Sequence, residues 1–134
     1  MKIIGLDDRE YSFVPSNNQS KVSSRSKLHE KAYRVIRERY PLSNILQEVS
    51  LPGSKTRINS TLQADFFLPI ERVVIEVHGE QHYKFNTHFY NSKRDFLRAQ
   101  GRDRNKEKWC EKNDITHVAL AYNETEEEWK EKLC

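Results

Sequence analysis

The chain has 134 residues, of which 32% are charged and 36% hydrophobic, and its formal net charge is +3. This length fits one domain that buries roughly two-thirds of the surface of its unfolded chain. It carries only two cysteines and no apolar run typical of a signal peptide or membrane span. We therefore expect an intracellular protein of the reducing cytoplasm, without a disulfide scaffold and without a membrane partner.

Charge is unevenly distributed along the chain. Residues 21–39 carry seven basic and two acidic side chains, and residues 93–112 carry eight basic and four acidic. Residues 124–132 reverse the balance, with five acidic and two basic. Two basic segments and an acidic tail favour a nucleic-acid partner over a membrane, although solvated helix faces explain such runs about equally well.

The hydrophobic periodicity predicts a single α/β domain. Its elements, in chain order, are a β-hairpin over 2–14, a polar linker over 15–25, a helix from Ser26 to before Pro41, strands over 45–51, 62–68 and 73–77, a long helix over 91–113 with a candidate break at Gly101, a strand over 115–121 and a charged terminal helix over 125–133. The short connection 69–72 predicts an antiparallel hairpin. Residues 26–121 thus give an αβββαβ core, a mixed sheet flanked by helices, with residues 122–134 as a terminal extension.

Two carboxylates interrupt apolar strands of that predicted hairpin. Asp65 follows Ala64 in the first, and Glu76 stands within the run VVIEV of the second. A carboxylate in an apolar strand costs several kcal/mol unless a metal, a proton or a partner neutralises it. Asp65 and Glu76 together predict a site for Mg²⁺ or Mn²⁺. The alternative is a structural ion pair or hydrogen-bonded pair.

Polar residues follow the second carboxylate at once. His78 shares a strand face with Glu76, because alternate residues of a strand point the same way. Gly79 permits a bend, which would bring Gln81 and His82 over the same edge. Histidine is the side chain most readily poised near neutral pH, so His82 is a candidate general base.

The long helix supplies a further acid and a set of basic residues. Its inward stripe at helical spacing contains Asp103, together with Phe96, Ala99, Glu107 and Cys110. An inward acid needs a partner, so Asp103 is a candidate to orient His82 or a bound water. The candidate phosphate contacts are Lys84, Arg94, Arg98 and Arg102, with plain solvent exposure as the alternative.

The order helix, ADFF, VVIEVHGEQHY and GRDRNKEKW resembles the PD-(D/E)xK nuclease superfamily. More closely, it is similar to the branch of very-short-patch repair endonucleases and phage EDxHD homing endonucleases. The resemblance covers roughly residues 26–121. It implies a restriction-endonuclease-like core, Asp65 as a metal ligand, His82 as the site histidine and Asp103 as the helix acid.

The resemblance also marks departures. His78 stands where the superfamily has a lysine after Glu76, which implies histidine-assisted activation of water. The early helix acid of the family corresponds to Glu30, but Glu30 lies away from the apolar stripe, and Glu48 competes for that place. The repair enzymes carry a structural zinc site, and the cysteines and histidines here are too sparse to support one.

We therefore predict a Mg²⁺-dependent endonuclease that cleaves or nicks DNA, of homing or repair type, in a phage or its bacterial host. Its small size predicts that long-site specificity would need a homodimer or another partner. The alternatives are a non-catalytic nucleic-acid-binding module on the same fold and, with least support, a structural zinc protein.

Overall fold

The computed structural model describes residues 1–17, 27–57, 60–80 and 92–134. It contains strands β1 (Lys2–Ile4), β2 (Glu10–Ser12), β3 (Leu46–Ser50), β4 (Gln63–Leu68), β5 (Val73–His78) and β6 (Thr116–Ala121), and helices α2 (Lys27–Arg39), α3 (Lys93–Lys112) and α4 (Glu126–Lys132).

The predicted order of elements is confirmed. The ends of the predicted helices and sheet strands differ from the observed ones by no more than two residues, and β1 pairs with β2 in the predicted hairpin. The candidate break at Gly101 is wrong, because α3 runs continuously from Lys93 to Lys112. Most of the predicted linker, residues 18–25, lies outside the described residues.

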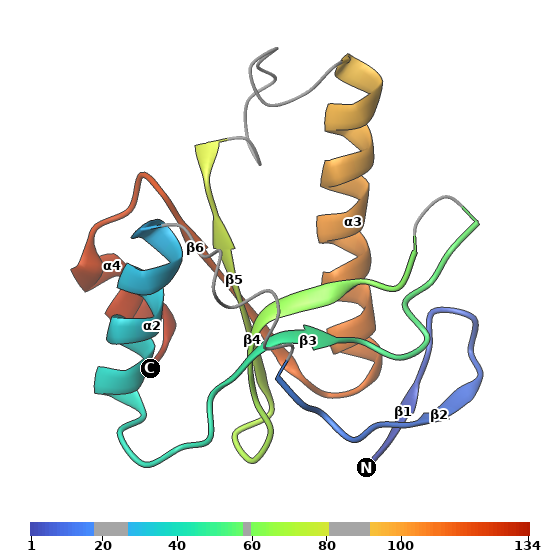
Figure 1. Ribbon diagram of the computed structural model, residues 1–134, viewed down its shortest axis with the longest axis horizontal. Coiled ribbons are helices and arrows are strands. Elements are labelled where there is room, and N and C mark those ends of the chain that lie inside the picture. Colours follow the sequence, from blue (N-terminus) through green and yellow to red (C-terminus); the bar gives the residue numbers. More distant parts are fainter. Residues whose placement is uncertain (18–26, 58–59, 81–91) are drawn as a thin grey trace.

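Four strands form a mixed sheet in the order β3-β4-β5-β6. The first two pairings are antiparallel and the third is parallel, so α3 serves as the crossover from β5 to β6. Helices α2 and α4 lie on one side of the sheet, and α3 lies on the other (Figure 1). The result is an α/β fold with a mixed sheet between two helical layers.

A separate apolar cluster fills each side of the sheet. On the α3 side, Phe67 and Val74 pack with Trp109 and with Phe13 beside the hairpin. On the other side, the cluster is made by α2, α4 and the opposite faces of the same strands, with Ala32, Ile36, Phe66, Ile75 and Trp129 among its members. Strands β4 and β5 are therefore apolar on both faces, which makes their two acids exceptional.

The two central strands separate after a short paired stretch. β4 and β5 pair from Leu68↔Val73 only as far as Phe66↔Ile75. Beyond that point β4 stays with β3, to Ser50↔Gln63, and β5 stays with β6, to His78↔Ala121. In Figure 1 the upper part of β5 rises away from β3 and β4. We call the point where β4 and β5 separate the fork. Asp65 and Glu76 are the first residues of the two strands beyond the last pair.

The N-terminal hairpin packs against the connection between β3 and β4 through two glycines. A Cβ atom on Gly53, whose φ is +75°, would lie 2.6 Å from the Cα of Gly5. Leu6 N also donates to Gly53 O at 2.8 Å. Neither glycine can be replaced without moving one backbone away from the other.

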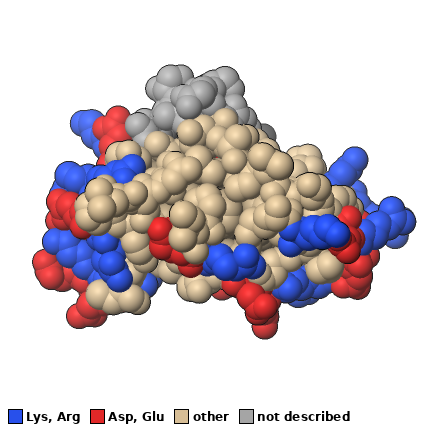
Figure 2. Space-filling view, turned by 90° about the horizontal axis from the view of Figure 1, so that it is seen from below, with Lys and Arg blue, Asp and Glu red and all other residues tan. Residues whose placement is uncertain are grey.

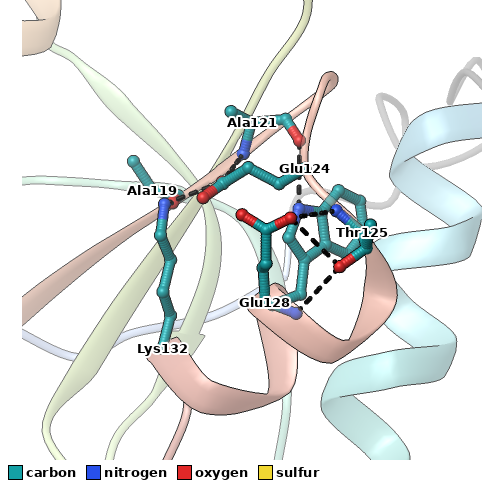
Figure 3. Close-up of polar contacts among 7 residues, drawn as sticks. Ala119, Ala121, Glu124, Thr125, Glu128 and Lys132 are labelled. Atoms are coloured by element: carbon teal, nitrogen blue, oxygen red, sulfur yellow. Dashed lines mark hydrogen bonds and ion pairs between the residues drawn. The ribbon is translucent and has the colours of Figure 1, made fainter.

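A polar cluster attaches α4 to the end of β6 (Figure 3). Glu124 accepts hydrogen bonds from Ala121 N at 2.8 Å and from Lys132 Nζ at 2.7 Å. Trp129 Nε1 donates to Ala121 O at 3.0 Å, and Thr125 and Glu128 form a capping box at the start of the helix. Together these bonds hold Trp129 in the core on the α2 side.

Charged side chains do not form a continuous patch of one sign on the face seen from below. Figure 2 shows Lys and Arg interleaved with Asp and Glu at both ends and along one rim, with uncharged residues between them. Within the part of the chain that the structure describes, no helix has the length and apolar character needed to cross a membrane.

Replacing Glu124 with Gln should weaken the attachment of α4. Burial opposes the charge, but the bonds from Lys132 and Ala121 outweigh it and lower the pKa of Glu124. A lowered pKa gives stability that is present above the ordinary value of 4.5 and is lost as the pH falls through the folded-state value. We expect Glu124→Gln to lower the free energy of unfolding by about 1–2 kcal/mol at pH 7. The difference should shrink in acid.

Urea titrations at several pH values measure this effect. Glu127→Gln is the matched control, because the Glu127 side chain is 85% exposed. Equal unfolding free energies for the two variants at pH 7 would contradict the role given to Glu124.

Candidate metal centre

Asp65 lies at the fork and bonds to the neighbouring strand. Its carboxylate Oδ2 accepts a hydrogen bond from Val77 N at 2.8 Å. The strand pairing has already ended at Phe66↔Ile75, so the side chain replaces the backbone acceptor that a continued β4 would have supplied. Asp65 is half-buried, which leaves part of its carboxylate open to other ligands.

Glu76 lies beside Asp65 and is enclosed. Its residue is 2% exposed, and it lies close enough to Asp65 for the charges of the two carboxylates to act on each other. The Nζ of Lys106, from α3, lies 3.3 Å from Glu76 Oε1. That contact is an ion pair without hydrogen-bond alignment, since Oε1 has no hydrogen-bond partner. The predicted pair of carboxylates is thus brought together, with a lysine as third member.

The electrostatics of this group favour a proton or a cation between the acids. Burial raises the pKa of Glu76 well above 4.5, and the charge of Asp65 raises it further, while Lys106 acts in the opposite direction. For Lys106, burial lowers the pKa, but Glu76, Asp65 and Asp103 together raise it, so the ammonium stays charged. Two carboxylates and one ammonium leave a negative site when both acids are ionised.

A second group meets Asp65 from the side of α2. One potential ligand atom each from His29, Glu48 and Asp65 lies within 4.8 Å of the others. His29 is buried on α2, where its ring lies 4.5 Å from the ring of Phe66. Asp65 therefore belongs to both groups, with His29 and Glu48 on one side and Glu76 and Lys106 on the other.

The backbone of Glu48 is unusual for a strand residue. Its φ is +53°, in the left-handed region, which costs a non-glycine residue about 1–2 kcal/mol. Such outliers are frequent where a side chain is held for function. Between the two acids considered for this place, the structure puts Glu48 beside Asp65, whereas Glu30 is exposed on α2.

These donors fit a hard divalent cation. Carboxylate oxygens are the usual protein ligands of Mg²⁺, which keeps several waters, and Mn²⁺ also accepts an imidazole nitrogen. Asp65 and Glu48 would supply the oxygens and His29 a nitrogen, with Glu76 next to Asp65. The group of His29, Glu48 and Asp65 contains no cysteine, so this donor set differs from that of a structural zinc site.

The other predicted site residues lie in several places. His78 is buried at the end of β5, where its carbonyl accepts from Tyr122 N at 2.8 Å. Asp103 is half-buried on α3 and acts on Lys106 through its charge. The three predicted arginines of α3 are exposed: Arg94, Arg98 and Arg102. Gln81, His82 and Lys84 lie outside the described residues. Glu107, predicted on the inward stripe, is exposed, and Trp109 takes up the buried space instead.

Two members of the site were not predicted from the sequence. Lys106 follows Asp103 at i+3, a spacing that puts both on one helix face, but it lies within a basic run that reads as solvent-exposed. His29, Ala32 and Ile36 stand at i, i+3 and i+7, so His29 belongs to the apolar stripe of α2. A single polar residue on such a stripe was the available signal.

Comparison with known proteins finds relatives in viruses. The chain is 36% identical over 64 residues to Uncharacterized protein 307L of Invertebrate iridescent virus 6, and 32% identical over 63 residues to Uncharacterized protein 033L of Invertebrate iridescent virus 3. The matches cover 48% and 47% of this chain, but only 32% of each relative. No family model and no solved structure matches the chain.

Replacing Glu76 with Gln should change how stability depends on pH in metal-free buffer. A carboxyl group whose folded-state pKa is raised gives stability that is present below 4.5 and lost as the pH rises through the folded-state pKa. Each pKa unit corresponds to about 1.4 kcal/mol. We expect wild type and Glu76→Gln to be similar near pH 4.5, with the variant gaining at least about 1 kcal/mol relative to wild type by pH 8.

Chemical denaturation in EDTA across this range provides the measurement. Glu111→Gln, an exposed change on α3, should follow the wild-type profile. A variant that instead loses stability steadily relative to wild type would mean that the ion pair with Lys106 stabilises the ionised acid.

Proposed function

We propose that this protein is a metal-dependent endonuclease that cleaves or nicks DNA, with Mg²⁺ or Mn²⁺ as its cofactor. The observation that carries the proposal is the position of Asp65 at the fork, in contact with the buried Glu76 and within ligand distance of Glu48 and His29. A divalent cation held there would supply Lewis acidity at the scissile phosphate. Three acids converging between apolar strands are hard to explain by stability alone.

Each residue of the site has a chemical task in this proposal. Asp65 binds the cation and keeps its orientation through the bond from Val77 N. Lys106 Nζ offers a positive charge to the phosphate oxygens as negative charge develops on them. Glu76, whose pKa burial raises, favours a bound proton in the absence of metal, and its carboxylate would help Asp65 to hold the cation. His82 remains the proposed general base, with Asp103 as the group that orients it or a bound water.

Lys106 lies close to Glu76, the acid after which the sequence departs from the nuclease superfamily. The residue two positions after Glu76 is His78 rather than lysine, yet an ammonium lies 3.3 Å from Glu76 because α3 supplies it. We take this as support for a restriction-endonuclease-like core of the very-short-patch or EDxHD type. In this chain, helix α3 provides the positive charge that the strand lacks. The order αβββαβ and the forked mixed sheet are consistent with that proposal.

The proposed substrate, DNA, also predicts where the protein works and whether it acts as a dimer. An enzyme acting on DNA would work inside a cell, phage-infected or virus-infected, and a second copy of the chain would extend a site that one small domain cannot cover. The matched relatives are viral proteins, and the matched segment spans about a third of their length. We therefore propose that the nuclease domain is one part of those larger viral relatives.

A non-catalytic DNA-binding module is the second candidate function. It is favoured by the ion pair between Lys106 and Glu76, because a lysine that neutralises a buried acid removes part of the need for a metal. Cleavage that depends on divalent metal separates the two candidates.

Asp65→Asn should abolish metal-dependent cleavage. The amide keeps the size of the side chain but loses the negative charge that binds the cation, so the rate should fall at least about a hundredfold. The measurement is nicking and linearisation of supercoiled plasmid with Mg²⁺, with Mn²⁺ and with EDTA.

Asp114→Asn is the matched control, since Asp114 is exposed beyond α3 and asparagine accepts its φ of +53°. Cleavage by Asp65→Asn at the rate of this control would refute the metal centre. The absence of cleavage by the wild type in all three conditions would support the binding module.

Lys106→Met should lower the cleavage rate about a hundred- to a thousandfold and leave DNA affinity nearly unchanged, because its charge acts on the phosphate at the site. Lys106→Arg keeps the positive charge and should retain part of the rate. Single-turnover cleavage and DNA binding in EDTA measure the two effects separately.

Lys108→Met, on the exposed face of the same helix, serves as the control. If Lys106→Met loses DNA affinity but cleaves bound DNA at the wild-type rate, Lys106 is a contact for DNA and its chemical task is wrong.

A further inference from the structure

A groove lies on another face of α3, beside the loop that joins β3 to β4. Its volume is about 670 Å³, and its walls carry Arg57 from the loop and Arg94, Arg98 and Arg104 from the helix. The loop is held against α3 by Trp109, whose Nε1 donates to Pro52 O at 2.7 Å. The groove therefore has one wall from each of two elements that are fixed to each other.

The four arginines of the groove have no acidic partner among the residues that the structure describes. Among the described residues, none of them forms an ion pair or a hydrogen bond, and no Asp or Glu lines the groove. Two arginines elsewhere do have protein partners: Arg34 pairs with Glu126, and Arg37 donates to Ser43 O at 2.8 Å. Four guanidinium groups around one concave surface repel each other, so the groove favours an anionic ligand.

Gly101 forms part of the groove surface, and packing does not account for it. In the interior of a helix, glycine is destabilising relative to alanine. A Cβ atom on Gly101 would find its nearest neighbour, Arg104 Nη2, 3.8 Å away, so the fold has room for alanine. The missing side chain instead lets a ligand approach the helix backbone closely.

The chemistry of the groove selects phosphate rather than bases. Guanidinium groups bind phosphate oxygens in a bidentate manner. None of the described lining residues is aromatic, whereas proteins that hold single strands by their bases stack them on aromatic rings.

We propose that this groove binds the phosphate backbone of double-stranded DNA without reading its sequence. The choice of DNA as occupant rests on the proposed function; the preference for a polyphosphate rests on the groove itself. α3 then presents Lys106 and Asp103 to the fork and the arginines to the backbone of the duplex, so one helix joins binding to the site.

Binding of a short duplex of arbitrary sequence, measured in EDTA over a range of NaCl concentrations, tests this proposal. Each phosphate contact contributes about −0.9 to the slope of log affinity against log salt. Arg98→Gln should therefore reduce the magnitude of the slope by about 1, and Arg94→Gln/Arg98→Gln by about 2. Arg9→Gln is the control, an exposed arginine in the turn of the N-terminal hairpin that does not line the groove.

Gly101→Ala provides a second, independent readout. The substitution should raise the melting temperature, because alanine favours the helix, and should weaken DNA binding, because its methyl group enters the groove. A variant that is more stable and binds as tightly as wild type would overturn the close approach of the ligand to α3.

Two further results would overturn the proposal: a slope that changes in Arg9→Gln but not in Arg98→Gln, and competition by poly-glutamate as effective as competition by DNA. Failure of the proposed function is distinguishable. If the groove variants lose DNA binding but the wild type cleaves no DNA with any metal, the groove proposal holds and the proposed nuclease function is wrong. If the groove variants cleave and bind DNA like the wild type, the nuclease function holds and the groove proposal is wrong.

Discussion

The hydrogen bond from Val77 N to Asp65 is the interaction on which the site depends. Two β-strands can separate inside a protein only if the backbone groups they expose find other partners. Here one carboxylate satisfies the first N–H beyond the end of the pairing. The same carboxylate then stands in the opening with Glu76 at its side, so the group that permits the fork is also the group that makes it chemically useful.

The acids of the site lie in a sheet that is covered on both faces. α2 and α4 cover one face of the sheet and α3 covers the other, which leaves the acids little access to water. A site in such a place must bring its own counter-charge, and Lys106 supplies it from α3. Without metal, the raised pKa of Glu76 favours a proton on that acid, and the charge of Lys106 offsets the charge of Asp65.

The sequence predicted the part of the site that follows from the pairing of two neighbouring strands. A short turn fixes the antiparallel register, so Asp65 and Glu76 had to meet once both strands were assigned. It did not predict Lys106, because the rotation of α3 is set by how Trp109 and Cys110 pack on the sheet. It left Glu48 undecided against Glu30, since a left-handed residue inside a strand breaks the alternation on which such reasoning relies.

The connection between β3 and β4 is closed at its base by two hydrogen bonds. Leu51 N donates to Leu62 O at 2.9 Å, and Ser54 Oγ accepts from Leu62 N at 2.8 Å. With the two ends tied, added residues between them would cost only loop-closure entropy, about 0.6 kcal/mol for each doubling of length. During evolution this loop could lengthen or diverge without disturbing the fork. Under the proposed function, related proteins could in this way acquire different DNA preferences around an unchanged site.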